Sequence, residues 1–327
     1  MCAREAVTGS DPRVLWWRRG QEGIAACVCA IGVFDGVHAG HRRLIGQMRA
    51  AAARRGLPAV VVTFDRDPAC VLGQKSGDKL LSDADRIACL LDAGADRVCL
   101  VPFDEEVAAM PPDRFLEGCL GAFLGAREVH VGVDFAFGRR AAGRVGDIER
   151  WGRNAGCVCR PHELYRLAGD VVTSTRVRTL LAAGRVVEAS CLLGRDHYVR
   201  GTVVHGRGAG RDLGFPTANV EADPSCALPA PGVYAGYVAA GGRSMPSAIS
   251  VGVSPTFPDA PGHLECHVVD FDGDLYGREV RVAFADRLRA MMDFRTTDEL
   301  VDTVLANVQW VRAHLCQKPE GGERAWA

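Results

Sequence analysis

Hydrophobic and polar positions follow different patterns in the two halves of this chain. In the first half, short apolar runs cover residues 24–31, 58–64, 97–101, 127–131 and 157–159. Between these runs, apolar residues recur at helical spacing over residues 42–55, 82–94, 113–123, 147–154 and 175–183. Strands that alternate with helices favour a parallel sheet covered by helices on both faces. The first half is therefore predicted to be an α/β domain.

Beyond residue 184, short apolar runs are separated by clusters of glycine, proline and aspartate. They cover residues 198–204, 232–238, 247–251, 264–269 and 279–284. This spacing is typical of an antiparallel barrel or sandwich. Residues 296–299 (Thr-Thr-Asp-Glu) fit a capping box and predict a C-terminal helix. We predict two domains, residues 1–184 and residues 185–327.

Length and composition fit two ordinary globular domains. The chain has 327 residues, of which 48% are hydrophobic and 24% charged, and its net charge is -1. That balance gives no broad electrostatic footprint for nucleic acid or an anionic membrane. Residues 1–20 lack the apolar stretch of a signal peptide, and no run approaches the roughly 18–20 apolar residues of a membrane span. We expect a cytoplasmic protein, monomeric or weakly homo-oligomeric, with no nucleic-acid or membrane partner.

Cysteine is the unusual residue type, with 13 in the chain. Cys27 and Cys29 are two residues apart in a strand-like run, as are Cys157 and Cys159, so each pair shares a face. Structural zinc sites more often use the wider C-x₂₋₄-C spacing. We expect reduced, buried cysteines that act as small hydrophobic residues. Metal binding or redox chemistry is the alternative.

The most informative segment is 32–41, Gly-Val-Phe-Asp-Gly-Val-His-Ala-Gly-His. It stands between an apolar run and a helical pattern, an arrangement that places backbone N–H groups against an anion. His38 and His41 add side chains that donate hydrogen bonds to phosphate oxygens. Zinc binding is the rival interpretation, but no clear third ligand follows nearby. The segment predicts a nucleotide phosphate site, whose further expected residues are Gly32, Phe34 and Gly40.

A second group of phosphate-binding side chains lies at residues 173–178 (Thr-Ser-Thr-Arg-Val-Arg), again at a helix start. Taken alone, Ser174 or Thr175 can simply cap the helix. Together with the histidine segment, the hydroxyls and the guanidinium groups of Arg176 and Arg178 are expected to bind a triphosphate.

The second half has its own glycine-rich loop within residues 201–219. Such a loop brings backbone N–H groups close to phosphates. The residues expected at the phosphates are Gly206, Arg207, Gly208, Gly210 and Gly214. In the Pro-Thr-Ala-Asn that follows, Thr217 and Asn219 offer a hydroxyl and an amide oxygen, which are hard ligands suited to Mg²⁺. The loop is neither a Walker A sequence nor a protein-kinase loop.

The two N-terminal motifs together resemble the H-x-G-H and S/T-S-T-x-x-R signatures of the nucleotidylyltransferase superfamily. Residues 132–138 (Gly-Val-Asp-Phe-Ala-Phe-Gly) and 61–65 (Val-Val-Thr-Phe-Asp) narrow the resemblance to the flavin-adenylating module of prokaryotic bifunctional riboflavin kinase/FAD synthetases. The resemblance implies a Rossmann-like nucleotidylyltransferase domain and substrate-lining roles for Asp134 and Phe135. A glycine-terminated turn with core phenylalanines explains the same residues. The expected catalytic residues of this domain are His38, His41 and Arg176.

Residues 192–219, 231–234 and 264–277 resemble the riboflavin kinase domain of the same family, an antiparallel β-barrel. The resemblance implies that Thr217 and Asn219 bind the Mg²⁺–nucleotide and that Glu265 acts as base on the ribityl 5′-hydroxyl. A carboxylate suits this role, because phosphoryl transfer needs mainly positioning and charge neutralisation. The alternative for Glu265 is an exposed residue on a barrel strand.

The chain departs from the family pattern in places. The T-F-D/E-P-H-P element reads Thr-Phe-Asp-Arg-Asp-Pro at residues 63–68, and an R-x-E-x-x-F-like element at 289–294 lacks its glutamate. Both expected catalytic cores remain. The sequence predicts a bifunctional enzyme that uses ATP and Mg²⁺ to convert riboflavin to FMN, and FMN to FAD with release of pyrophosphate. The alternatives are a single surviving activity, a modified flavin substrate, or a non-catalytic flavin-binding or regulatory protein.

Overall fold

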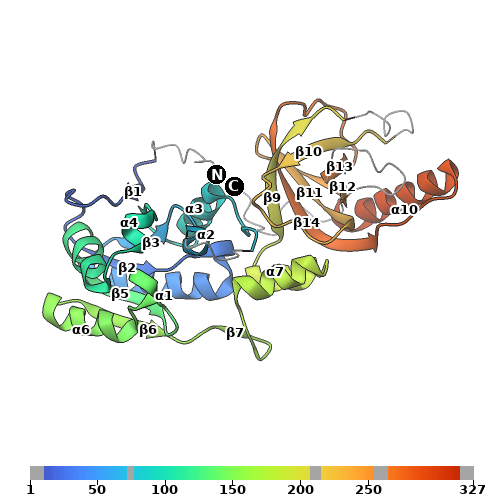
Figure 1. The fold of residues 1–327 in the computed structure, drawn as a ribbon. Coiled ribbons are helices and arrows are strands. Elements are labelled where there is room, and N and C mark those ends of the chain that lie inside the picture. The colour runs from blue at the N-terminus through green and yellow to red at the C-terminus, as the bar shows by residue number, and fades with distance from the viewer. Residues whose placement is uncertain (1–10, 72–76, 207–214, 253–263, 317–327) are drawn as a thin grey trace. The chain divides into compact units, whose positions relative to one another are not determined.

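The computed structural model describes residues 11–71, 77–206, 215–252 and 264–316. Within them the chain forms two compact units. The first unit contains the described residues up to Gly77 together with Asp83–Thr173, and the second contains Asp78–Ser82 together with the described residues from Ser174 onward. A parallel α/β unit and an antiparallel barrel with a C-terminal helix confirm the predicted fold class (Figure 1).

The first unit is built on a six-stranded parallel sheet in the order β1-β4-β3-β2-β5-β6. Its strands are β1 (Val14–Trp16), β2 (Cys27–Ile31), β3 (Ala59–Phe64), β4 (Arg97–Val101), β5 (Ala126–Gly132) and β6 (Val158–His162). Every residue of β2 and β3 is buried, as expected for central parallel strands. The strand order reverses between β2 and β5. Open α/β sheets bind ligands at the carboxyl ends of the strands that flank such a reversal.

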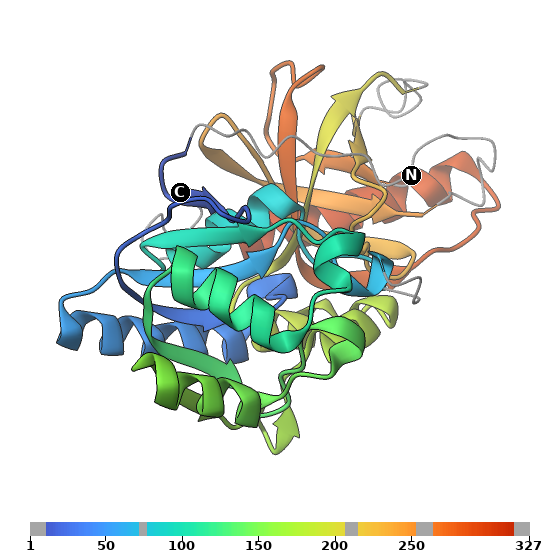
Figure 2. The same cartoon turned by 60° about the vertical axis from the view of Figure 1, so that its left-hand side comes forward.

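Helices of the first unit connect these strands (Figure 2). They are η1 (Asp35–Val37), α1 (Ala39–Arg55), α2 (Pro68–Val71), α3 (Asp83–Asp92), α4 (Glu105–Ala108), α5 (Pro112–Phe115), η2 (Leu116–Phe123), η3 (Arg139–Ala141) and α6 (Val145–Ala155), and a small hairpin pairs β7 (Arg166–Leu167) with β8 (Asp170–Val171). The predicted single helix at 113–123 is a short α-helix that continues as the π-helix η2. Apolar residues three and four apart fit either helix type, so the sequence pattern does not distinguish them.

The cysteines of β2 belong to the hydrophobic core. Cys27, Cys29 and Ile31 alternate onto one face of the strand and join a core cluster that includes Phe115 and Leu120. The cysteines whose side chains the structure describes form no disulfide with one another, and of these Cys191 and Cys316 are exposed. Burial raises the pKa of the Cys157 thiol to about 12, which keeps it neutral at physiological pH. In the described part of the chain, no group of three or more histidine, cysteine or acidic side chains could hold a metal ion.

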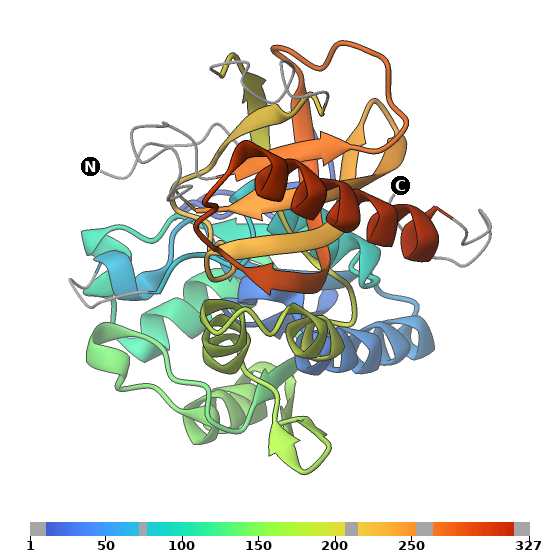
Figure 3. The same cartoon turned by 90° about the vertical axis from the view of Figure 1, so that its right-hand side faces the viewer.

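The second unit is a closed six-stranded antiparallel barrel, which decides between the barrel and sandwich predictions. Its strands are β9 (His197–Val204), β10 (Ala218–Ala222), β11 (Gly232–Ala240), β12 (Arg243–Val251), β13 (Leu264–Val268) and β14 (Glu279–Ala290). Helices α7 (Ser174–Ala182) and α8 (Val186–Leu193) precede the barrel. Helix α10 (Thr297–Leu315) lies across its outside (Figure 3) and packs Val308 and Val311 against Ala235 and Ala248. The hydroxyl of Thr296 accepts a hydrogen bond from the amide of Glu299 at 3.1 Å, which confirms the predicted N-terminal cap.

The chain enters the second unit twice. Its first entry is the short segment Asp78–Ser82, before the first unit is complete. The Lys79 amide donates to the Ser225 carbonyl, and the Ala227 amide donates to the Lys79 carbonyl, each at 2.8 Å. Lys79 thereby forms a parallel bridge with Cys226. The second unit thus contains a segment whose sequence neighbours belong to the first.

Candidate active sites

The histidine segment begins at the carboxyl end of β2, where the reversal of strand order predicts a ligand site. Gly32 follows the strand, and its amide donates to the Val62 carbonyl at 3.1 Å. Phe34 adopts a left-handed backbone conformation with φ of 56° and is buried. A Cβ on Gly32 would lie 3.2 Å from the Phe34 ring, so glycine lets this ring pack back onto the strand end. The segment forms a tight loop that leads directly into α1.

His38 and His41 lie against one another at the start of α1. His38 caps the helix, because its Nδ1 accepts a hydrogen bond from the His41 amide at 3.3 Å. A neutral His38 therefore carries its proton on Nε2. The two rings stack at a centroid distance of 3.6 Å and an angle of 14°. A Cβ on Gly40 would come within 3.2 Å of the His38 ring, which explains the glycine between the histidines.

The environment of His41 favours the neutral imidazole. Burial, reinforced by the neighbouring His38, holds the pKa of His41 well below the ordinary value of 6.5. Its Nδ1 is buried and has no hydrogen-bond partner among the described residues. Phe34 packs edge-on against the ring at 5.1 Å. A neutral histidine at a helix N-terminus can stabilise negative charge as a hydrogen-bond donor.

Asp134 and Phe135 follow β5, the strand next to β2, so the sheet brings both predicted segments to one edge. The Phe135 amide donates to the Gly132 carbonyl at 3.1 Å in a tight turn. Phe137 is buried in the core, as the turn interpretation expects, and Phe135 stacks on it at 5.6 Å while remaining partly exposed. Asp134 is exposed at the same edge. The turn thus combines a core phenylalanine with two residues that a ligand can reach.

Ser174, Thr175, Arg176 and Arg178 form the first turns of α7, where the sequence predicts a helix start. This helix belongs to the second unit. The Nε of Arg178 donates to the Asp78 carbonyl at 2.7 Å, within that unit. The Thr175 carbonyl accepts a hydrogen bond from the Thr179 hydroxyl at 3.1 Å.

In the barrel, strand pairing brings two predicted residues together. Asn219 on β10 and Glu265 on β13 are direct cross-strand partners. Side chains at such paired positions lie on the same face of the sheet and are close neighbours. Glu265 is partly buried, and this burial raises the pKa of its carboxyl above the ordinary 4.5. A Cβ on Gly206 would come within 2.0 Å of the Asn219 amide nitrogen, so the start of the glycine-rich loop also approaches this pair. Arg207, Gly208, Gly210 and Gly214 lie outside the described residues.

A cavity of about 330 Å³ opens beside the Pro-Thr-Ala-Asn segment. Its walls include Thr217, Cys266 and Tyr276. Tyr276 stacks on His205 at a centroid distance of 3.9 Å. The His267 ring lies 2.9 Å from the Pro216 carbonyl and holds the segment in place. The sequence analysis did not single out His205, His267 or Tyr276, because their roles depend on strand pairing rather than on a local motif.

A further residue that the sequence analysis missed is Arg86 of α3. It is buried, with an exposure of 4%, although arginine in an amphipathic helix ordinarily marks the solvent face. Its guanidinium contacts the loop after β2 and the end of β3. In the sequence, the only sign that Arg86 is buried is the presence of acidic residues around it in the first turn of α3.

Comparison with known proteins assigns the two halves separately. A family described as FAD synthetase matches residues 21–176, and one described as riboflavin kinase matches residues 193–315. Bifunctional riboflavin kinase/FMN adenylyltransferases of Pseudomonas fluorescens and Escherichia coli K12 are each 35% identical, over 88% and 86% of this chain and 92% and 89% of theirs. The Bacillus subtilis protein of the same name is 31% identical over 86% of this chain and 90% of its own.

A solved structure has the same fold over almost its whole length. It is described as a macrolide-efflux protein from Streptococcus pneumoniae, and it matches with a TM-score of 0.83 at 30% identity, covering 92% of this chain and 99% of that one. In the present structure, the described residues include no helix long and apolar enough to cross a membrane. The two matched families and the bifunctional relatives therefore lead to the same assignment. The chain belongs to the family of bifunctional riboflavin kinase/FMN adenylyltransferases.

Proposed function

We propose that this chain phosphorylates riboflavin to FMN in its barrel and adenylylates FMN to FAD with its N-terminal motifs, using one ATP for each step. The observation that carries the proposal is the presence of two separate sets of functional groups in one chain. One is the His38–His41 stack at the end of β2, and the other is the Asn219–Glu265 pair in the barrel. The family of the chain supports both activities.

In the kinase step, Glu265 accepts the proton of the ribityl 5′-hydroxyl as that oxygen bonds to the γ-phosphorus and ADP departs. Burial raises the pKa of the Glu265 carboxyl, which makes it a stronger base than an exposed carboxylate. Thr217 and Asn219, two residues apart at the start of β10, offer a hydroxyl and an amide oxygen that fit Mg²⁺, which prefers hard oxygen ligands and keeps substrate phosphates in its shell. These two residues would hold the ion, and its charge would offset that of the phosphates.

In the adenylyl step, a phosphate oxygen of FMN bonds to the α-phosphorus of ATP and pyrophosphate departs. The nucleophile is already ionised, so the site needs hydrogen-bond donors rather than a strong base. His38, with its proton on Nε2, and neutral His41 supply such donors at the start of α1. We assign Gly32, Phe34 and Gly40 to the phosphate loop, and Asp134 and Phe135 to the flavin side.

We also assign the groups at the start of α7 to the triphosphate, as their sequence motif implies. Ser174, Thr175 and Arg178 would bind the triphosphate, and Arg176 would stabilise the charge that develops on it. The FAD synthetase match extends to residue 176 and so includes this helix start. This supports functional domains of residues 1–184 and 185–327, although α7 packs with the barrel unit. We further propose a cytoplasmic enzyme, monomeric or weakly oligomeric, that takes riboflavin, FMN and ATP as substrates.

The test is incubation of the purified chain with riboflavin, ATP and Mg²⁺, followed by chromatographic separation of riboflavin, FMN and FAD. The proposal expects FMN to appear first and FAD to follow, with pyrophosphate released in proportion to FAD. FMN without FAD would mean that only the kinase activity survives. Flavin binding without either product would instead favour a regulatory flavin-binding protein.

A further inference from the structure

We propose that Arg86 is a positioning residue for adenylyl transfer, which fixes the shape of the loop that leads to His38 and His41. The inference rests on the proposed function of the first unit and adds to it a residue remote from the helix-start motif. Arg86 lies in α3, and all of its contacts described below are within the first unit.

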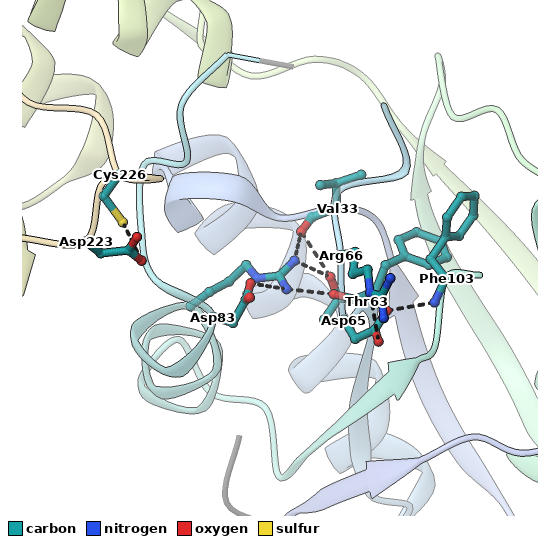
Figure 4. A network of polar contacts seen from close by, with 10 residues as sticks. Val33, Thr63, Asp65, Arg66, Asp83, Phe103, Asp223 and Cys226 are labelled. Carbon is teal, nitrogen blue, oxygen red and sulfur yellow. Dashed lines mark hydrogen bonds and ion pairs between the residues drawn. The ribbon is translucent and has the colours of Figure 1, made fainter. Parts of the chain in front are cut away.

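The guanidinium of Arg86 joins two chain segments. Its Nη1 donates to the Val33 carbonyl at 2.9 Å and to the Thr63 hydroxyl at 3.2 Å. Its Nη2 donates to the Phe64 carbonyl at 2.6 Å and to the Asp83 carboxylate at 3.0 Å. The Thr63 hydroxyl in turn donates to the Val33 carbonyl at 3.0 Å. Figure 4 shows Val33, Thr63 and Asp83 converging on this network.

The loop held by these bonds is conformationally strained. Phe34, directly after Val33, has a φ of 56°, and Val37 has a φ of 41°. Left-handed backbone is unfavourable for an L-residue, and such residues persist only where the surrounding structure holds them. The Val33 carbonyl accepts hydrogen bonds from both Arg86 and Thr63, immediately before the first strained residue. These bonds therefore stabilise the turn that delivers His38 to the N-terminus of α1.

Arginine suits this task better than lysine. The planar guanidinium holds acceptors on two nitrogens at once, whereas an ammonium is a single point donor. Three of the four acceptors of Arg86 are uncharged oxygens, and the fourth is Asp83. The geometry of the fork therefore sets the spacing between the end of β3 and the loop after β2. A displacement of about 1 Å at a catalytic group can lower the rate about 100-fold.

The test compares Arg86→Met, Arg86→Lys and the control Arg153→Met, which removes an exposed arginine of α6. FAD formation from supplied FMN is measured on folded protein, with FMN formation from riboflavin in the same preparation as the internal reference. We expect Arg86→Met to lower kcat/KM for FAD formation about 100-fold, mainly through kcat, while FMN formation changes less than about twofold. Arg86→Lys should recover at least about tenfold of the loss, and Arg153→Met should match the unsubstituted chain.

Thr63→Val is the second variant, because it removes one buried member of the network while leaving the Arg86–Val33 bond. We expect a loss of about fivefold or more in FAD formation, with FMN formation unchanged. If Arg86→Met does not fold, the result for Thr63→Val tests the inference on its own. FAD formation within threefold of the unsubstituted chain in folded Arg86→Met, or unchanged in Thr63→Val, would overturn the inference. Failure of the unsubstituted chain to make FAD would reject the proposed adenylyl activity instead.

Discussion

Replacing Glu265 with glutamine separates catalysis from stability at the barrel site. The substitution keeps the size of the side chain and its place opposite Asn219, but it removes the base. General-base catalysis typically contributes 10²- to 10⁴-fold, which corresponds to about 2.7–5.4 kcal/mol of transition-state stabilisation. We therefore expect FMN formation to fall by at least about 100-fold, with FAD formation from supplied FMN unchanged.

The Glu265→Gln variant should lose activity without losing stability. Because burial raises the pKa of Glu265 above its unfolded value, the ionised carboxylate weakens the folded state at neutral pH. A neutral amide removes that cost, so the unfolding midpoint in urea should stay the same or rise. In the unsubstituted chain, kcat/KM for FMN formation should fall about tenfold per pH unit below the raised pKa, and this limb should be absent from the residual activity of Glu265→Gln.

The matched control is Glu279→Gln on β14. That glutamate is exposed and forms an ion pair with Arg200 at 2.6 Å, so its loss should change FMN formation by less than twofold. The assay follows both flavin products by chromatography from one preparation of each variant. FMN formation by Glu265→Gln within threefold of the unsubstituted chain would refute the role of Glu265 as base. A parallel loss of FAD formation would refute the independence of the two sites.

Three other predictions concern His41, Asn219 and His197. His41→Ala should abolish FAD formation and spare FMN formation. Because the pKa of His41 lies well below 6.5, the pH profile of FAD formation in the unsubstituted chain should show no ionisation of His41 between pH 6 and 8. A change of rate near pH 6.5 that depends on His41 would contradict this prediction. Asn219→Ala should raise the Mg²⁺ concentration for half-maximal FMN formation about tenfold or more, measured by metal titration, and an unchanged titration would exclude a metal-binding role. Burial lowers the pKa of His197 to about 4, so the unfolded state gains a proton first as the pH falls below 6.5. The free energy of unfolding should therefore drop by about 2 kcal/mol from this group between pH 7 and pH 5, and His197→Gln should remove that part of the slope in urea unfolding.

Local patterns in the sequence predicted the elements that are long and regular. The apolar runs of the first half match β3 and β4 closely, and glycine ends α1 at Gly56 in the left-handed conformation that residue favours. The sequence analysis did not predict β1, which is only three residues long, or β10, which begins inside the Pro-Thr-Ala-Asn segment. Short strands at such positions depend on their partners more than on their own periodicity.

The same distinction applies to the candidate sites. The stack of His38 on His41 agrees with their three-residue spacing at a helix start, because residues three apart are neighbours on a helix surface. The pairing of Asn219 with Glu265 depends on the register of two strands distant in the sequence, and the family resemblance implied only that both residues act in the kinase reaction. Arg86 was missed because a charged residue near the start of a helix ordinarily faces solvent, and its burial is decided by acceptors on two other segments.

Because residues 78–82 belong to the barrel unit, they affect any attempt to produce one domain of the enzyme without the other. A chain that starts at residue 185 would lack Lys79, and the Ala227 amide and Ser225 carbonyl would lose their backbone partners. Ala227 also accepts the buried hydrogen bond of His197, so the damage would reach the base of β9. An autonomous kinase half therefore needs this five-residue piece restored, either as an added peptide or by circular permutation, rather than a single cut between the domains.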